Sequence, residues 1–324
     1  MKIRDVVYGT VEINEPILLE LIESPTVQRL KKINQHGLPP HLYYLPTPGF
    51  KRYDHCVGVM LLLRKLGASV EEQAAGLLHD ASHLAFSHLA DEVFDSGLEQ
   101  DLQDSIHEDF LRMTEIPEII QKHDLNFQRI VNYEHFPLLE QPAPALCADR
   151  VDYTLRELEE YADKEGVGMI VEALTTFNNR IVFKTKEAAQ RFARGYLKCQ
   201  VEHWGHADST ARYHLAATAF KEALKEGILT REDFYTDDET VLNKISKSSN
   251  PLIKKILSQL EKPILYTFEE NNPDIENYQK FRWINPAYLE EGNVVTLIEN
   301  DKEYATLVEK ERAINKKGTR LKFL

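Results

Sequence analysis

Apolar side chains recur every three or four residues along most of this chain, which is the spacing of helices with one buried face. The spacing predicts helices over residues 16–30, 56–66, 70–78, 101–113 and 145–161, and over much of 188–227 and 233–260. Ser24-Pro25 marks a break in the first segment, and Gly67 ends the second. The segments on either side of Gly67 are expected to pack as antiparallel neighbours. The pattern therefore predicts a mainly α fold.

The two ends of the chain follow a different pattern. Residues 1–16 carry alternating apolar positions, which predict a short strand or hairpin. Near the other end, three β-like runs are separated by Asn, Pro and Gly, at residues 264–268, 281–284 and 294–298. We therefore expect a small C-terminal α+β extension on a helical protein.

Composition and charge narrow the function. The 324 residues carry 39 Lys and Arg against 52 Asp and Glu, a formal net charge of −13, which argues against general nucleic-acid or membrane-surface binding. The three cysteines are widely spaced and form no CxxC motif, so a reducing cytoplasmic location is expected. No apolar run approaches the length of a membrane span. An anionic substrate would have to be held by a local basic cluster.

The stretch 76–91 concentrates side chains that bind metals or transfer protons. An apolar run leads directly into His79 and Asp80, and a carboxylate at the end of a buried helix must be paired or metal-bound. His83 follows one helical turn later, and His88 and Asp91 lie three residues apart. Imidazole and carboxylate together suit a first-row divalent metal. The stretch predicts a metal site that needs further ligands from elsewhere.

Other segments supply such residues in a recognisable order. They are Gln28 to Gly37, Arg52-Tyr-Asp-His55-Cys-Val-Gly58, Leu78 to His88, His107-Glu108 and Ala148-Asp-Arg-Val-Asp-Tyr153. With this order and spacing the chain resembles the HD superfamily of metal-dependent phosphohydrolases, in the branch that includes the deoxynucleotide triphosphohydrolases. The resemblance implies an HD-domain helical bundle over residues 1–180, which begins with the short strand or hairpin. Residues 181–324 would then be a helical continuation with a small β-containing C-terminal region.

The resemblance also assigns roles to individual residues. It implies that one divalent metal ion, whether Mn, Fe, Zn, Co, Ni or Mg, is bound by His55, His79, Asp80 and Asp149. His107 would be a proton donor or nucleophile partner oriented by Asp91, and His83 and His88 would line the phosphate and sugar pocket as further catalytic candidates. Substrate would be held by Gln35 at the sugar and by Arg52, Arg150 and Tyr153 at the phosphate.

One region departs from the family pattern. Relatives commonly place a basic pair that reaches the outer phosphates near residues 204–217, where this chain offers Asp208 and one fixed cation, Arg212. A nucleoside monophosphate or another phosphate ester therefore stays open beside a triphosphate. His203, His206 and His214 lie in the same region, but their spacing puts the third about three turns from the first, and we do not expect a second metal among them.

Three classes of function follow. The first is a metal-dependent phosphohydrolase that cleaves a phosphate ester bond of a nucleotide, a (deoxy)nucleoside triphosphate or a related one, with nucleoside monophosphate phosphatase as the variant. The second is an HD-type di-iron oxygenase, which would need extra histidine ligands on neighbouring helices. The third is a nucleotide-sensing module without turnover, whose expected mark, a lost metal ligand or a lost His107, is absent. The expected partner is a small-molecule nucleotide or phosphate ester, and relatives suggest a homo-oligomer.

Overall fold

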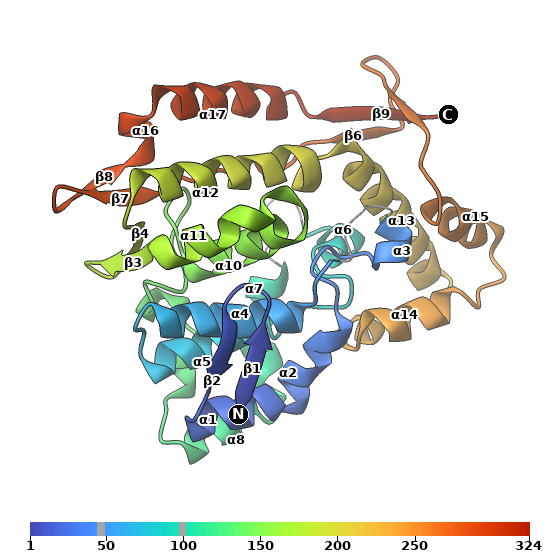
Figure 1. Cartoon of the computed structure of the whole chain (residues 1–324). Coiled ribbons are helices and arrows are strands. Elements are labelled where there is room, and N and C mark those ends of the chain that lie inside the picture. The colour runs from blue at the N-terminus through green and yellow to red at the C-terminus, as the bar shows by residue number, and fades with distance from the viewer. Residues whose placement is uncertain (44–48, 97–101) are drawn as a thin grey trace.

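The computed structural model confirms the mainly α fold and describes residues 1–43, 49–96 and 102–324 (Figure 1). Up to the middle of the chain the helices are α1 (Pro16–Glu23), α2 (Pro25–Arg29), α3 (Pro40–Tyr43), α4 (Arg52–Lys65), α5 (Val70–Leu78), α6 (Leu89–Val93), α7 (Leu102–Arg112), α8 (Ile116–Lys122), α9 (Phe127–Ile130) and α10 (Ala148–Glu157). They continue with α11 (Lys164–Ala173), α12 (Lys186–Cys199), α13 (Ala207–Lys225), α14 (Asp238–Ile245), α15 (Pro251–Leu260), α16 (Leu297–Asn300) and α17 (Lys302–Asn315).

Short helical segments of other types join these helices. Three 3₁₀ turns are η1 (Leu30–Lys32), η2 (Tyr133–His135) and η5 (Arg231–Tyr235), and two π-helical segments are η3 (Leu158–Ala162) and η4 (Gln200–Trp204). The predicted break at Ser24 is confirmed, because its hydroxyl accepts from the Val27 amide at 3.3 Å and caps α2. Pro16 and Pro25 begin their helices, where a missing N–H costs nothing.

The strands form three small sheets. β1 (Lys2–Asp5) and β2 (Gly9–Glu12) make the predicted N-terminal hairpin, and β3 (Leu174–Phe177), β4 (Arg180–Phe183), β7 (Ala287–Glu290) and β8 (Asn293–Thr296) pair in that order. The third sheet has the order β5 (Tyr266–Phe268), β9 (Thr319–Phe323) and β6 (Ile275–Asn277). The prediction of a strand at 281–284 was wrong: these residues are not paired in a sheet and run past the cleft described below.

Helix α4 lies at the centre of the main apolar core. All residues from His55 to Leu63 are buried, and α4 packs against α5 and α10. Gly58 lets α10 come close, because a Cβ there would collide with the side chains of Asp152 and Arg156. A second apolar core lies among α6, α13, α14 and α15. The central helices therefore carry their polar residues into the interior of the protein.

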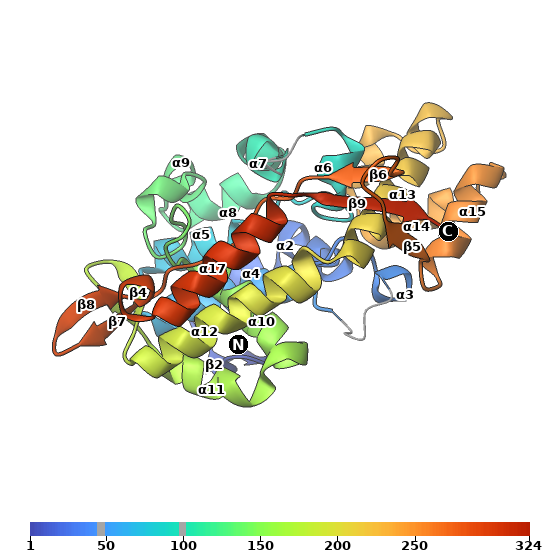
Figure 2. The same cartoon turned by 90° about the horizontal axis from the view of Figure 1, so that it is seen from above.

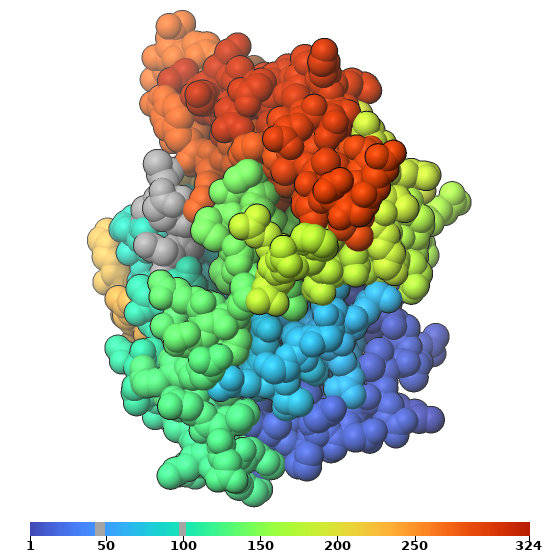
Figure 3. Space-filling model, turned by 90° about the vertical axis from the view of Figure 1, so that its left-hand side faces the viewer, coloured from blue at the N-terminus to red at the C-terminus, as the bar shows by residue number. Residues whose placement is uncertain are grey.

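The C-terminal residues lie across the helices that precede them. Seen from above, α17 follows α12 and continues into β9, which lies beside α13 (Figure 2). From the side, orange and red C-terminal residues form one end of the molecule, and blue N-terminal residues and green residues lie side by side at the other (Figure 3). Among the described residues, no helix has both the length and the apolar character needed to cross a membrane.

Candidate active site

The four predicted metal ligands converge from three helices. His55 comes from α4, His79 and Asp80 directly follow α5, and Asp149 lies in the first turn of α10. The His55 Nε2 atom is 3.2 Å from His79 Nε2, 3.1 Å from Asp149 Oδ1 and 3.6 Å from Asp80 Oδ2. Ligands bound about 2.0–2.2 Å from one ion lie roughly 3–3.5 Å apart. The donor atoms therefore fit a divalent metal ion, which His55, His79 and Asp80 could hold.

A second layer of contacts fixes the His55 ring. Its Nδ1 lies 2.8 Å from Asp152 Oδ2, and Asp152 also accepts from the Tyr8 hydroxyl at 2.9 Å and from Arg156 Nε at 2.8 Å. Arg156 donates in turn to Asp5 at 2.8 Å. Tyr8 and Asp5 belong to the N-terminal hairpin and its turn. Because Nδ1 is engaged by Asp152, the Nε2 atom is left facing the other ligands.

Charge also favours a cation at this centre. Burial alone would raise the pKa of Asp80 and of Asp149, but Arg52 holds the pKa of Asp80 low, and the hydrogen bonds from His55 and His79 do the same for Asp149. Burial would lower the pKa of His79, yet Asp80 and Asp149 raise it to about 9. The carboxylates are therefore ionised, and the site attracts positive charge as protons or as a metal ion.

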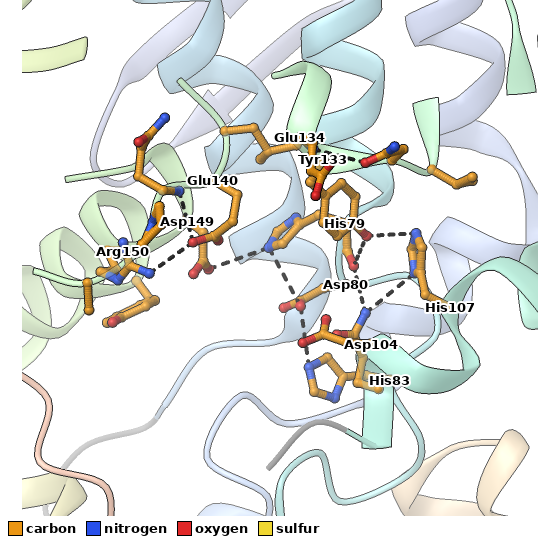
Figure 4. Close-up of a pocket in the computed structure, with 18 of the residues that line it drawn as sticks. His79, Asp80, His83, Asp104, His107, Tyr133, Glu134, Glu140, Asp149 and Arg150 are labelled. Carbon is orange, nitrogen blue, oxygen red and sulfur yellow. Dashed lines mark hydrogen bonds and ion pairs between the residues drawn. The ribbon is translucent and has the colours of Figure 1, made fainter. Parts of the chain in front are cut away.

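His107 has other hydrogen-bond partners than the expected Asp91. Its Nδ1 lies 2.9 Å from the Ser82 hydroxyl, and its Nε2 lies 2.7 Å from the hydroxyl of Tyr133, which donates to the His79 carbonyl at 2.8 Å (Figure 4). Both ring nitrogens of His107 are therefore engaged by neighbouring hydroxyl groups. Burial and the nearby His79 lower the pKa of His107 to about 4, so the ring is neutral at neutral pH. The sequence analysis did not identify Tyr133 as a residue of the site.

The expected pairing of His107 with Asp91 was wrong. Asp91 lies 3.1 Å from His88 Nδ1 and accepts from the Ser96 hydroxyl at 3.0 Å, so it orients His88 instead. His83 lies 3.3 Å from Asp80 Oδ1 and stands at a right angle to the His88 ring. The structure therefore places His83 and His88 together on the cleft beside the predicted metal ligands.

The two arginines proposed to bind phosphate differ in their surroundings. Arg52 is buried and donates to Asp80 and, at 3.0 Å, to the Ser87 hydroxyl. Arg150 donates to Glu140 and to the Ala145 carbonyl, each at 2.9 Å. Both arginines line the same cleft as His79, Asp80 and Asp149, three of the predicted metal ligands. Arg52 is therefore fixed at the centre, whereas Arg150 is part of an ion pair at the side of the cleft.

The cleft has two adjoining chambers. The first, of about 1510 Å³, holds His79, Asp80, Asp149 and His107, and the second, of about 460 Å³, extends away from them. Among the described residues, six line both chambers and form what we call the shared rim: Gln35, Arg52, His88, Tyr153, Lys280 and Arg282. The hydroxyls of Tyr153 and Tyr196 are 2.8 Å apart in the first chamber.

Lys280 and Arg282 were missed by the sequence reasoning. Arg282 lies in the run 281–284, which was interpreted as a strand, and Lys280 directly precedes that run; the two cations alternate with Phe281 and Trp283. The positive charge of Arg282 lowers the pKa of Tyr153, Tyr196 and Tyr213 against the larger effect of burial, which raises it. The guanidinium therefore lies near the hydroxyls that line the cleft. The alternating cations were a signal in the sequence, but nothing there located them beside His79.

Arg212, which lies in the region that departs from the family pattern, has a structural role. Arg212 is fully buried and donates to Asp208 at 2.6 Å and to the carbonyls of Leu42 and Leu260 at 2.9 and 2.6 Å. His203 lies 2.8 Å from Glu157, and His214 is instead 4.0 Å from Glu92. Arg212 is thus engaged within the fold rather than in the cleft.

The comparison with known proteins identifies the class. The family model described as HD domain matches residues 52–157, the span that contains the four predicted ligands. Over 303 residues the chain is 31% identical to the metal-dependent phosphohydrolase cns2 of Cordyceps militaris, which covers 90% of this chain and 85% of that protein. The chain therefore belongs to the HD-domain family of metal-dependent phosphohydrolases, and it is a hydrolase that acts on phosphate esters.

Two further sequence relatives and a solved structure extend this comparison. The chain is 37% identical over 292 residues to the uncharacterised protein YdhJ of Bacillus subtilis, covering 89% of this chain and 88% of that protein. A shorter match, 33% identity over 107 residues, joins it to the deoxynucleoside triphosphate triphosphohydrolase SAMHD1 of Bos taurus and covers 28% of this chain and 18% of SAMHD1. A phosphohydrolase from Bacteroides thetaiotaomicron shares the fold, with a TM-score of 0.69, 17% identity and coverage of 95% and 96%.

Proposed function

We propose that this phosphohydrolase cleaves a phosphate ester bond of a nucleotide, with a (deoxy)nucleoside triphosphate or a related nucleotide as substrate. The observation that carries the proposal is the pair of adjoining chambers with three cations, Arg52, Lys280 and Arg282, on their shared rim. A phosphate at the rim would lie between the candidate ligands and the second chamber. A nucleoside would then face that chamber's aromatic and amide side chains, among them Trp204 and Tyr213.

The residues of the first chamber suit hydrolysis of such an ester. A divalent metal held by His55, His79, Asp80 and Asp149 would supply Lewis-acid chemistry at the phosphoryl group. Arg52 would add a fixed guanidinium, whose planar fork matches two phosphate oxygens. His107 and Asp104 lie one turn apart on α7 and both line the chamber. Either of these two side chains could hold or deliver a proton.

A nucleoside monophosphate is the second candidate substrate. The observation in its favour is Arg212, whose guanidinium is buried among carbonyl groups and Asp208 and so is not placed to grip outer phosphates. The partial similarity to a deoxynucleoside triphosphate triphosphohydrolase supports the triphosphate instead. The two candidates share the nucleoside in the second chamber and differ in the group that leaves.

A product assay tests the proposal. Purified protein with Mn²⁺ would be offered nucleoside mono-, di- and triphosphates, and phosphate, pyrophosphate and triphosphate would be measured separately. We expect one nucleotide class to be hydrolysed and the His79→Ala variant to be inactive. Hydrolysis of p-nitrophenyl phosphate and sugar phosphates with no hydrolysis of any nucleotide would contradict a nucleotide substrate. Saturable nucleotide binding without any hydrolysis of phosphate esters would favour a sensing module.

A further inference from the structure

A second group of histidine and carboxylate side chains lies outside the predicted metal centre. His36 follows η1, Glu157 is the last residue of α10, and His203 lies within η4. His36 Nδ1 is 3.5 Å from Glu157 Oε1, and His203 Nδ1 is 2.8 Å from Glu157 Oε2. One donor atom from each residue lies within 4.8 Å of the other two. We call this group the His36 cluster.

The backbone around the His36 cluster is unusual. The π-helical segment η3 begins directly after Glu157, and the π-helical segment η4 contains His203. π-helical turns are rare and occur frequently at functional sites, because the extra residue in the turn changes which side chains face a neighbour. Two such turns meet at one carboxylate here. This independent feature of the backbone points to a site rather than to ordinary helix packing.

The cluster places a buried negative charge beside imidazole nitrogens. The Glu157 side chain is 2% exposed and the His203 side chain 3%. Burial alone would raise the pKa of Glu157, but His36 and His203 lower it, so the carboxylate is ionised. Burial lowers the pKa of His36 to about 4, which leaves that ring neutral at neutral pH. The adjacent Arg156 is bonded to Asp152 and Asp5. A buried carboxylate with imidazole nitrogens beside it is a ligand set for a divalent cation.

We propose that His36, Glu157 and His203 form a second metal site, which takes Zn²⁺ or a similar first-row divalent ion. Two histidines and one glutamate are a protein ligand set of zinc sites that keep a fourth position open. His36 and Glu157 line the second chamber. The ion could enter from this chamber, and its open fourth coordination position would point into it. The proposal does not rest on the nucleotide as substrate.

The ligand spacing can be compared with that of the predicted centre. The 3.5 Å between His36 and Glu157 falls within the 3.1–3.6 Å found among His55, Asp80 and Asp149. The shorter contact of His203 with Glu157 would have to open by roughly 0.5 Å to admit an ion. Outer contacts are also present, because Trp204 Nε1 donates to Glu157 Oε1 at 3.0 Å and the Phe50 ring packs edge-on against His36.

Metal counting tests the second site without any activity assay. Chelated full-length protein would be reloaded with Co²⁺, and bound metal would be measured by elemental analysis and by visible absorption. We expect two equivalents in the wild type and one each in His36→Gln, Glu157→Gln and His203→Ala. His79→Ala should lose the other equivalent and keep the absorption of the His36 cluster. The control is His214→Ala, whose side chain is 40% exposed, and it should keep two.

The outcomes of this experiment distinguish the proposed second metal site from the proposed nucleotide hydrolysis. One equivalent in saturated wild-type protein overturns the second site, whatever the variants do. Two equivalents that persist in folded Glu157→Gln and His36→Gln proteins also overturn it, because the second ion would then be bound elsewhere. If His203→Ala fails to fold by circular dichroism, the two glutamine variants decide, since they preserve side-chain size and polarity. Failure of nucleotide hydrolysis would leave these counts unchanged.

Discussion

The two walls of the cleft are held in place in different ways. One, the metal wall, consists of His55, His79, Asp80 and Asp149 with Arg52, and most of these side chains are buried in a network that reaches the N-terminal hairpin. The other, the C-terminal wall, is the unpaired segment 278–283. Lys280 on this wall is exposed and Arg282 is half-buried.

Backbone groups and the Gln279 side chain help to anchor the C-terminal wall. The Arg282 amide donates to Gln200 Oε1 at 3.3 Å, and Gln279 donates to the Thr210 hydroxyl at 2.9 Å. Asn315 of α17 donates to the Gln279 carbonyl at 2.8 Å. The difference teaches that the predicted metal ligands are fixed by a side-chain network that reaches the hairpin, whereas backbone groups help to fix the C-terminal wall. The residues matched by the HD-domain family model, 52–157, include the metal wall but not the C-terminal wall.

The largest effect should come from the metal wall. His79→Ala and Asp149→Ala should each lose the bound ion of the first centre, abolish measurable hydrolysis and lower the melting temperature. The remaining buried carboxylate and imidazole groups would lose their common partner. Elemental analysis, with the first centre counted apart from the His36 cluster, and thermal unfolding check this result. His88→Ala, a cleft histidine outside the ligand set, should keep the metal, and full metal content in Asp149→Ala would refute the assignment.

The second-largest effect should come from substitution of His107, which should lower kcat without changing the metal content. His107→Ala should lower kcat by about 10²- to 10⁴-fold, the usual contribution of a positioned acid or base. Tyr133→Phe should lower it less, because the ring remains and only the bond that orients His107 is lost. Steady-state kinetics on metal-loaded protein measures both. Near-normal kcat in both variants would move the proton-transfer role to Asp104, which faces the same chamber.

Arginine substitutions compare the two walls directly. Arg52→Lys should lower kcat/KM about tenfold and also lower stability, because the fork that bonds Asp80 and Ser87 is lost. Arg282→Ala should raise KM about tenfold with little change in kcat or melting temperature. Kinetics with thermal unfolding distinguishes the two, and Lys317→Ala, an exposed cation elsewhere, is the control. A lost metal ion in Arg282→Ala would show that the walls are not separate.

Arg150→Ala should have the smallest effect. Its guanidinium is engaged by Glu140 and the Ala145 carbonyl, so we expect kcat/KM to fall by only about threefold, less than 1 kcal/mol of transition-state stabilisation. The Glu140→Gln variant tests the reason, because release of Arg150 from the ion pair should leave kcat/KM unchanged or slightly higher. A tenfold loss in Arg150→Ala would return this residue to the phosphate-binding group.

The sequence predicted the metal wall better than the C-terminal wall for a physical reason. His79 and Asp80 are adjacent at the end of an apolar helix, so their burial follows from local pattern alone. Lys280 lies about 200 residues further along, and its place depends on how α12, α13 and α17 pack, which no local pattern encodes. The run around Phe281 alternates as a strand does, yet in the described part of the chain it pairs with no strand.

The error at Asp91 has a related cause. The family resemblance implied that Asp91 orients His107, although His88 lies only three residues from Asp91 in the sequence. The structure gives it to His88, three residues away, while Ser82, Gln103 and Tyr133 surround His107 from separate segments. Choices of partner between helices are set by tertiary packing, so a single sequence leaves them open.

The bond from Tyr8 to Asp152 has a consequence for the order in which the enzyme acquires its chemistry. It joins residues 144 positions apart, and through Asp152 it steadies the imidazole of His55, a predicted metal ligand. A fragment restricted to residues 52–157 would contain the four ligands but not Tyr8 or Asp5. Binding of the ion at full affinity would then be a late event in folding. It would follow the packing of the N-terminal hairpin against α10. Uptake of metal during refolding would report completion of the native topology, not the formation of helices.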